Sequence, residues 1–218
     1  MADTVNVKEI MQKRYTTKHY LPGKKIPEAV FDQLMEALRL APTSVNAQLT
    51  RFYVARTQEA KERIAPAIMD FNVPRILNAS DVVVIAVKEE ADEAHLQRVL
   101  EKEKLDGRFP NDEIMKAQDE GRRHFVDLNR QGIGVYQWAS RQAYIAFGIL
   151  LESAALLGIN ATAIEGLECD KMDEILGFKK LGLRTLACVS LGYADPKDAN
   201  GIRPKSRLNR EELIKTID

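Results

Sequence analysis

Cysteine and long apolar runs are both scarce in this 218-residue chain. Its two cysteines, Cys169 and Cys188, form no CxxC pair and lie in or beside apolar stretches, which argues against a disulfide framework and predicts buried thiols in a reducing compartment. The longest purely apolar run covers residues 82–87, far short of the roughly 20 residues that a membrane-spanning helix needs. The first residues contain no apolar signal core. We therefore expect a cytoplasmic protein that does not bind membranes.

Net charge is also absent, because 32 Lys and Arg residues balance 32 Asp and Glu residues. A nucleic-acid partner normally requires a basic excess, so the balance argues against one. Hydrophobic residues make up 45% and charged residues 29% of the chain, as in ordinary globular proteins. The length and the lack of repeats or flexible linkers predict one domain over residues 1–218.

Several familiar site motifs are missing. There is no G-x-x-x-x-G-K-[ST] or G-x-G-x-x-G phosphate loop, so a bound nucleotide would be held by scattered side chains. No His or Cys pair has ligand spacing, which argues against a metal site. His19 and His95 are expected at the surface, and no Ser/His/Asp signature supports nucleophilic catalysis. We assign no catalytic side chain.

The first half of the chain predicts three helices and two strands. Helices are expected over about residues 5–13, from Pro27 to Pro42, and after a Thr57 cap until about Pro66. Strands are expected over residues 51–56 and 81–88. The second of these is β-branched and apolar throughout, so both of its faces should be buried.

The second half begins with a charged, mostly helical excursion over about residues 89–130. A helix from about 136 to 157 follows, so apolar around its circumference that we expect it to be central, with Trp138 as packing. Strands are predicted over residues 159–163 and 185–191 with a short helix between them, and residues 192–209 are predicted to be a loop. Few, unevenly spaced strands indicate an α+β fold and disfavour a regular Rossmann winding.

Two windows of the neutral chain contain no acidic residue. Residues 13–20 include Arg14, Thr16 and Lys18, and residues 201–208 include Lys205 and Arg207. Cations with hydroxyl groups suit a phosphate monoester, because Arg offers a fork, Lys a mobile charge, and Ser or Thr neutral donors. A solvated basic face is the alternative interpretation of each window.

The order of the polar segments resembles the nitroreductase family of FMN-dependent NAD(P)H oxidoreductases. The resemblance is closest to the bacterial oxygen-insensitive nitroreductase and dihydropteridine reductase group. Five short motifs follow one another in family order over more than 190 residues: Arg14-x-Thr-x-Lys, Pro42-Thr-Ser-x-Asn-x-Gln, Asn72-x-x-Arg, Ile164-Glu-Gly and Pro204-Lys-Ser-Arg. The resemblance implies a nitroreductase-like fold with a central, mixed but mostly antiparallel sheet flanked by helices, in an intertwined homodimer that holds FMN at the subunit interface.

The resemblance also implies roles for individual residues. Arg14, Lys205 and Arg207 would hold the FMN phosphate, Thr16 and Lys18 the ribityl chain and ring, and Asn72 with Arg75 the polar edge of the ring. Glu165 and Gly166 would place backbone groups near flavin N5. The partner subunit would contribute Thr43, Ser44 and Asn46. The motifs include further expected cofactor contacts at Tyr15, Pro42, Gln48 and Ile164. The expected substrate pocket comprises Phe71, His124, Phe125 and Thr50. For the three aromatic residues, a packing role is the alternative interpretation.

The chain departs from the family pattern at a few positions. Leu49 and Thr50 replace a common Pro-Trp pair, Ala47 replaces a serine, Arg75 replaces a lysine, and Ala163 replaces a proline. These changes concern substrate preference more than FMN binding. The predicted activity is two-electron, ping-pong hydride transfer from NADH or NADPH to nitroaromatics, quinones or similar acceptors. Reduction of free flavin or a dihydropteridine, and flavin binding without turnover, remain as alternatives.

Overall fold

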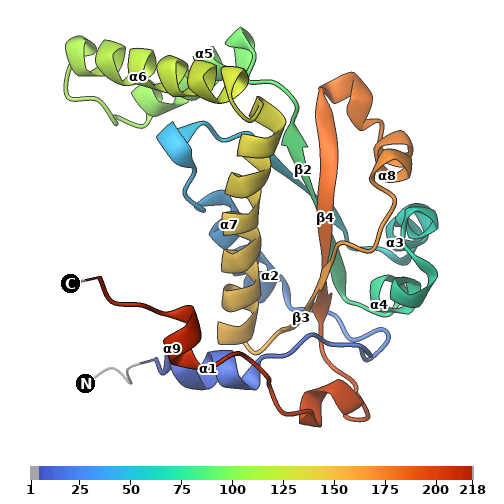
Figure 1. Cartoon of the computed structure of the whole chain (residues 1–218). Coiled ribbons are helices and arrows are strands. Elements are labelled where there is room, and N and C mark those ends of the chain that lie inside the picture. The colour runs from blue at the N-terminus through green and yellow to red at the C-terminus, as the bar shows by residue number, and fades with distance from the viewer. Residues whose placement is uncertain (1–4, 218) are drawn as a thin grey trace.

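A four-stranded antiparallel sheet organises residues 5–217, which are described by a computed structural model (Figure 1). Its strands are β1 (Thr50–Ala55), β2 (Asp81–Lys88), β3 (Asn160–Ile164) and β4 (Leu183–Gly192), in the order β1-β2-β4-β3. Each neighbouring pair is antiparallel, and a register shift occurs between Ile85 and Ala86. The parallel component of the predicted mixed sheet consists of an isolated bridge between Thr16 and Ala161. The predicted α+β class is confirmed.

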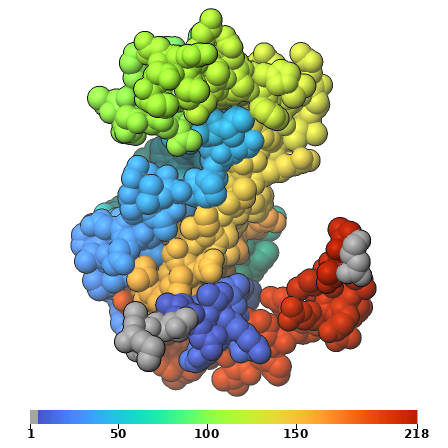
Figure 2. All heavy atoms as spheres, turned by 90° about the vertical axis from the view of Figure 1, so that its left-hand side faces the viewer, coloured from blue at the N-terminus to red at the C-terminus, as the bar shows by residue number. Residues whose placement is uncertain are grey.

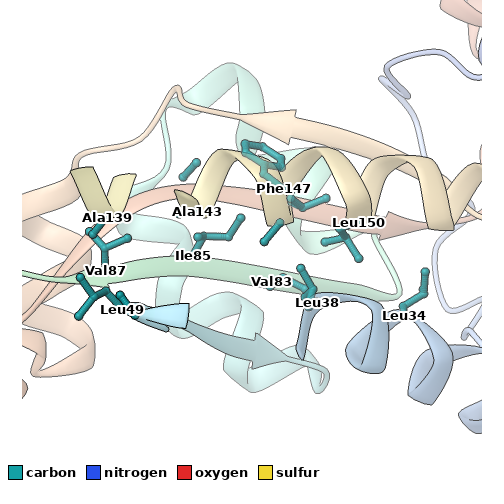
Figure 3. Close-up of a cluster of buried hydrophobic side chains, with 14 of the residues drawn as sticks. Leu34, Leu38, Leu49, Val83, Ile85, Val87, Ala139, Ala143, Phe147 and Leu150 are labelled. Carbon is teal, nitrogen blue, oxygen red and sulfur yellow. The ribbon is translucent and has the colours of Figure 1, made fainter. Parts of the chain in front are cut away.

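One face of the sheet is covered by α7 (Val135–Leu156) and α2 (Glu28–Arg39). In Figure 3, Val83, Ile85 and Val87 point from β2 towards Ala139, Ala143, Phe147 and Leu150 of α7, beside Leu34 and Leu38 of α2. The small side chains of Ala139 and Ala143 allow the backbone of α7 to approach the strand closely. Trp138 is buried in the same cluster, as predicted.

The opposite face of the sheet packs against α3 (Gln58–Ile64), α4 (Val73–Leu77) and α8 (Cys169–Leu176). Val82, Val84 and Ala86 point to this side, so β2 is buried on both faces as its composition predicts. Thr57 caps α3 as expected, because its hydroxyl oxygen accepts a hydrogen bond from the Ala60 N–H at 3.1 Å. Short 3-10 turns complete this layer at Ala65–Ala67 (η2), Asp70–Asn72 (η3) and Phe178–Leu181 (η4).

The predicted helical excursion consists of α5 (Glu93–Leu105) and α6 (Asp112–Gln131), which lie at one end of α7 in Figure 1. At the other end are α1 (Val7–Lys13) and the C-terminal arm, residues 201–217. The arm includes part of η5 (Ala199–Ile202) and the four-residue helix α9 (Arg210–Leu213), neither of which was predicted. Every residue of the arm is exposed, and the arm stands away from the body in Figure 2.

Three burial predictions need correction. Helix α7 is covered on one side only, and Tyr144, Ile145 and Leu156 on its other side are 42–46% exposed. His95, expected at the surface, is 3% exposed, because its ring fills the space beneath the loop before β1 and its Nε2 hydrogen-bonds Ala47 O at 2.7 Å. Cys188 is buried, but Cys169, at the start of α8, is only half-buried. Within residues 5–217, no helix is long and apolar enough to cross a membrane.

Candidate functional site

The two basic windows, nearly 200 residues apart in sequence, meet in a hollow of about 320 Å³ that we call the basic hollow. Its lining includes Arg14, Tyr15, Thr16, Lys205 and Arg207, together with Lys13, Arg203 and Ser206. The Lys205 ammonium donates a hydrogen bond to the backbone carbonyl of Arg14, which joins the two ends of the chain directly. The predicted association of these windows is therefore present in a single subunit.

Three basic side chains in and beside the basic hollow, Arg14, Lys205 and Lys18, have a lowered pKa. Desolvation is the largest cause for Arg14, followed by the charge of Arg207. The pKa of Lys205 is lowered by desolvation and by Arg14 and Arg207. Desolvation and the charges of Arg75 and Arg203 likewise lower the pKa of Lys18. Such crowding of like charge is relieved by a bound anion, so the arrangement fits a phosphate group.

Asp198 fixes the geometry of the basic hollow, although the sequence analysis did not select it. Its buried carboxylate accepts hydrogen bonds from the backbone N–H groups of Lys18 at 2.7 Å and His19 at 3.2 Å. Asn200 completes the connection by donating its side-chain amide to Thr16 O at 2.6 Å. The sequence signal is the Asp-Ala-Asn-Gly stretch, typical of a capped turn, which indicates a turn but not what the turn holds.

Asn72, Arg75 and Gly166 form a second group, the Asn72–Gly166 corner. The Asn72 amide donates to Gly166 O at 3.2 Å, and the Arg75 guanidinium donates to Asn72 Oδ1. A methyl group at position 166 would lie 2.6 Å from Asn72 Nδ2, so this approach requires glycine. Phe71 is 65% exposed at the same place, with the Arg75 guanidinium 5.8 Å from the centre of its ring.

Tyr144 of α7 reaches the end of β3, where its hydroxyl donates a hydrogen bond to Glu165 Oε1. Desolvation and this hydrogen bond raise the pKa of Tyr144 to about 12. Ile164 is buried, whereas Glu165 is exposed. Tyr144 could not be selected from the sequence, because it stands within the apolar pattern of α7.

A groove along α7 and β3 connects the basic hollow with Tyr144 and Glu165. A hollow of about 250 Å³ shares Arg14 and Tyr15 with the basic hollow and extends to Leu151. Leu151 also lines a hollow of about 480 Å³ that ends at Tyr144 and Glu165. The lining therefore runs from a cationic end, along apolar helix and strand surface, to a hydrogen-bonding end.

The Thr43–Gln48 loop, which includes the 3-10 turn η1 (Ser44–Asn46), lies elsewhere in the subunit. The Ser44 N–H donates to Gln142 Oε1 at 2.9 Å, whereas the basic end of the groove meets α7 at Ala155. At 1.5 Å per residue these points are about 20 Å apart along the helix. Pro42, Thr43 and Asn46 line a separate hollow of about 540 Å³.

The four residues of the expected substrate pocket are likewise not gathered within one subunit. Phe125 lines the hollow at the loop, and His124 packs edge-on against Phe125 with 5.8 Å between ring centres. Thr50 lines a different hollow, of about 340 Å³, together with Gln48. Phe71 belongs to the Asn72–Gly166 corner. The expectation of one pocket comprising all four is therefore not met within the described subunit.

The chain belongs to the nitroreductase family, whose sequence model matches residues 11–193. It is 35% identical to an oxygen-insensitive NAD(P)H nitroreductase of Salmonella typhimurium, over 98% of this chain and all of that protein. It is 32% identical to the major NAD(P)H-flavin oxidoreductase of Aliivibrio fischeri, over 94% of this chain and 95% of the relative. Among solved structures, a protein from Exiguobacterium sibiricum in complex with FMN has the same fold, with a TM-score of 0.83, 22% identity and 98% coverage of both chains. The predicted family and fold are confirmed.

Proposed function

We propose that this protein is an FMN-dependent NAD(P)H oxidoreductase that reduces nitroaromatics, quinones or similar acceptors by ping-pong hydride transfer. The observation that carries the proposal is the basic hollow, in which hydroxyl groups and crowded cations meet at the head of a groove that ends at Tyr144 and Glu165. Family membership and the names of the relatives support the same chemistry. When bound, FMN would accept hydride from NADH or NADPH and pass it to the acceptor.

The donor set fits the successive parts of FMN, from the basic hollow to the Asn72–Gly166 corner. Arg14, Lys205 and Arg207 would hold the phosphate, and Thr16 and Lys18 the ribityl region. Asn72 and Arg75 would contact the polar edge of the ring, beside the backbone of Glu165 and Gly166. Because Arg75 already donates to Asn72 Oδ1, the Asn72 side chain is presented with a fixed orientation.

The cations also favour the reduced ring. Hydride transfer increases negative charge at the ring's polar edge, and a cation fixed about 4 Å from such a charge contributes roughly 4 kcal/mol at an effective dielectric of about 20. Arg75 and Lys18 lie near enough for the charge of one to lower the pKa of the other, so the corner is electropositive before any ligand binds. Such preorganisation contributes to catalysis without a side chain that exchanges protons.

We further propose that the active unit is an intertwined homodimer. The uncovered side of α7 crosses the face of the molecule seen in Figure 2, and the C-terminal arm exposes Ile202 and Ile217 by 88% and 96%. Apolar surface of this kind is typical of a covered interface. The separation between the Thr43–Gln48 loop and the basic hollow supports the same arrangement, because a second copy can bring its loop to this subunit's groove.

Reduction of free flavin or a dihydropteridine is the second candidate, favoured by similarity to the Aliivibrio fischeri flavin oxidoreductase. Leu49 and Thr50, which replace the family's Pro-Trp pair, differ in how they can affect the choice of acceptor. Leu49 is buried in the core, so its side chain offers almost no surface to a substrate, while Thr50 lines a hollow that a larger aromatic residue would narrow. Steady-state comparison of nitrofurazone, menadione, FMN and quinonoid dihydropterin distinguishes the two activities.

Replacing both arm cations tests the cofactor site. Lys205→Ala with Arg207→Ala should release FMN on dialysis, since two charge-assisted contacts of about 1.5–3 kcal/mol each are lost. Flavin occupancy is measured from the visible spectrum. The control is Lys179→Ala with Lys180→Ala, a pair of exposed lysines in η4 that should leave occupancy unchanged. Unchanged occupancy in the arm variant would place the phosphate elsewhere, and a wild-type protein that takes up no FMN would overturn the proposed function.

A further inference from the structure

The backbone of the Thr43–Gln48 loop is strained. Three of its non-glycine residues have positive φ angles: 47° at Val45, 52° at Asn46 and 51° at Gln48. The left-handed region is unfavourable for any residue with a Cβ atom, and a β-branched residue such as Val45 is a clear outlier there. Such a conformation persists only where surrounding structure enforces it. The groups that enforce this conformation therefore matter to whatever the loop does.

Those groups come from the helical excursion. Glu103 of α5 and Arg122 of α6 form an ion pair in which both side chains are at most 5% exposed. Arg122 Nε donates to Val45 O at 3.0 Å, and Asn46 Nδ2 donates to Glu103 Oε1 at 2.6 Å. The imidazole of His95, also from α5, bonds Ala47 O at 2.7 Å. Three consecutive residues of the loop are thus each held by a buried polar group of the excursion.

Stability alone does not account for this ion pair. Burying two charges is costly in desolvation, and replacing a buried pair with apolar groups of similar size is often neutral or stabilising. A second ion pair already joins the same helices at the surface, where the Arg123 guanidinium binds both carboxylate oxygens of Glu93. What distinguishes the buried pair is its contact with Val45 and Asn46.

We propose that Glu103 and Arg122 are positioning residues for the flavin reaction: they hold the strained loop so that Thr43, Ser44 and Asn46 are presented to the active site of the partner subunit. This inference rests on the proposed function. It assigns the excursion a role in building the neighbouring active site. It also explains why the side-chain amide of Asn46 has a fixed orientation, since one of its N–H groups is hydrogen-bonded to Glu103.

The test compares Glu103→Gln with Glu93→Gln, its matched control. Both variants remove one carboxylate from an α5–α6 ion pair, but only Glu103 touches the loop. Because Glu103→Gln leaves the Arg122 charge buried without its partner, the double variant Glu103→Gln with Arg122→Met is made as well, which removes both charges while keeping volume. Hydrogen–deuterium exchange is followed at the amides of Asn46, Ala47 and Gln48, which bond within the loop.

We expect loop exchange at least about tenfold faster in Glu103→Gln and in the double variant, with exchange in β2 unchanged and Glu93→Gln like the wild type. We also expect kcat/KM for the acceptor to fall by about ten- to a hundredfold, the effect of a small misplacement of active-site groups. FMN affinity should change less than threefold, because the phosphate is held at the basic hollow.

Three results would overturn the proposal: wild-type loop exchange in both Glu103 variants, equal acceleration in Glu93→Gln, or a mobile loop with unchanged kcat/KM. The exchange measurement needs no flavin, so it decides the positioning role independently of turnover. A wild-type protein that oxidises NAD(P)H with none of the acceptors would count against the proposed function instead.

Discussion

Because Gly166 has no side chain, the segment after β3 can lie close to η3 (Asp70–Asn72) at the proposed ring site. The Gly166 carbonyl accepts both the Met69 backbone N–H at 3.1 Å and the Asn72 side-chain amide at 3.2 Å. A Cβ atom there would collide with that amide and lie 3.3 Å from the Phe71 ring. Asn72 is 4% exposed and could not move without losing its bond to Arg75.

We therefore expect Gly166→Ala to weaken FMN binding by about tenfold or more, and to destabilise the apo-protein by about 1–3 kcal/mol through overpacking. Flavin titration by fluorescence and urea unfolding measure the two effects. Gly121→Ala in α6 is the control for stability, because nothing lies within 4 Å of its added methyl group and alanine favours a helix. A Gly166→Ala variant as stable and as flavin-rich as the wild type would show that the corner is loosely built.

At the scale of elements, the contact between α5 and the Thr43–Gln48 loop should depend on pH through His95. Desolvation is the main cause that lowers the pKa of this imidazole, and the charges of Arg51, Lys88 and Arg98 lower it further, against the opposing hydrogen bond to Ala47 O. The folded protein thus holds His95 neutral where the unfolded chain would protonate it. Its contribution to stability is present above about pH 6.5 and is lost as the pH falls below that value.

We expect the wild-type free energy of unfolding to fall more steeply than that of His95→Gln between pH 7 and pH 5, by at most about 1.4 kcal/mol per pH unit. Urea unfolding of both proteins at several pH values gives the difference. Carboxylates that titrate in the same range are present in both proteins, so their effects on the free energy of unfolding cancel in the difference. Parallel stability curves would mean that His95 ionises in the folded state as freely as in the unfolded chain.

The sequence predicts best those helices and strands that have a continuous pattern of apolar residues. Strand β2 was placed at its observed limits because its residues are β-branched or apolar throughout, and α7 was placed within a residue at each end. Helix α9 was missed because four residues give no periodic signal. The uncovered side of α7 was taken as buried because its apolar residues have the composition of a core.

Some residues of the candidate site could also be predicted from sequence, and others could not. Arg14, Lys205 and their neighbours could be selected because cations without nearby carboxylates are visible in sequence. Asp198, Tyr144 and Glu103 could not, since each gains its role from a partner brought close only by folding: Lys18 is 180 positions from Asp198. Asp198 and Glu103 are acidic residues in ordinary polar surroundings of the sequence, where a solvated carboxylate is the natural interpretation.

At the scale of the whole molecule, the two parts of the proposed site lie apart within one subunit. The basic hollow opens into a groove along α7 that ends at Tyr144 and Glu165, one residue before Gly166. The Thr43–Gln48 loop meets α7 at Gln142, about 20 Å along the helix from the basic hollow, and lines a hollow of its own. A two-fold arrangement that covers the open side of α7 would form two equivalent sites, each built from the groove of one chain and the loop of the other. Association and cofactor retention should therefore be coupled.

Ile145→Arg tests that coupling. Ile145 is 44% exposed on the open side of α7, so an arginine there leaves the isolated subunit's core intact but places a charge in the proposed interface. We expect sedimentation to show monomers, and the visible spectrum to show FMN lost on dilution, because each monomer retains only its own half of the contacts. Leu181→Arg, at a 53% exposed position of η4 in the layer on the opposite face of the sheet, should remain a dimer with its flavin bound. An Ile145→Arg protein that stays dimeric would move the interface to another face, and a monomer that keeps FMN as tightly as the wild type would show that one chain completes the site.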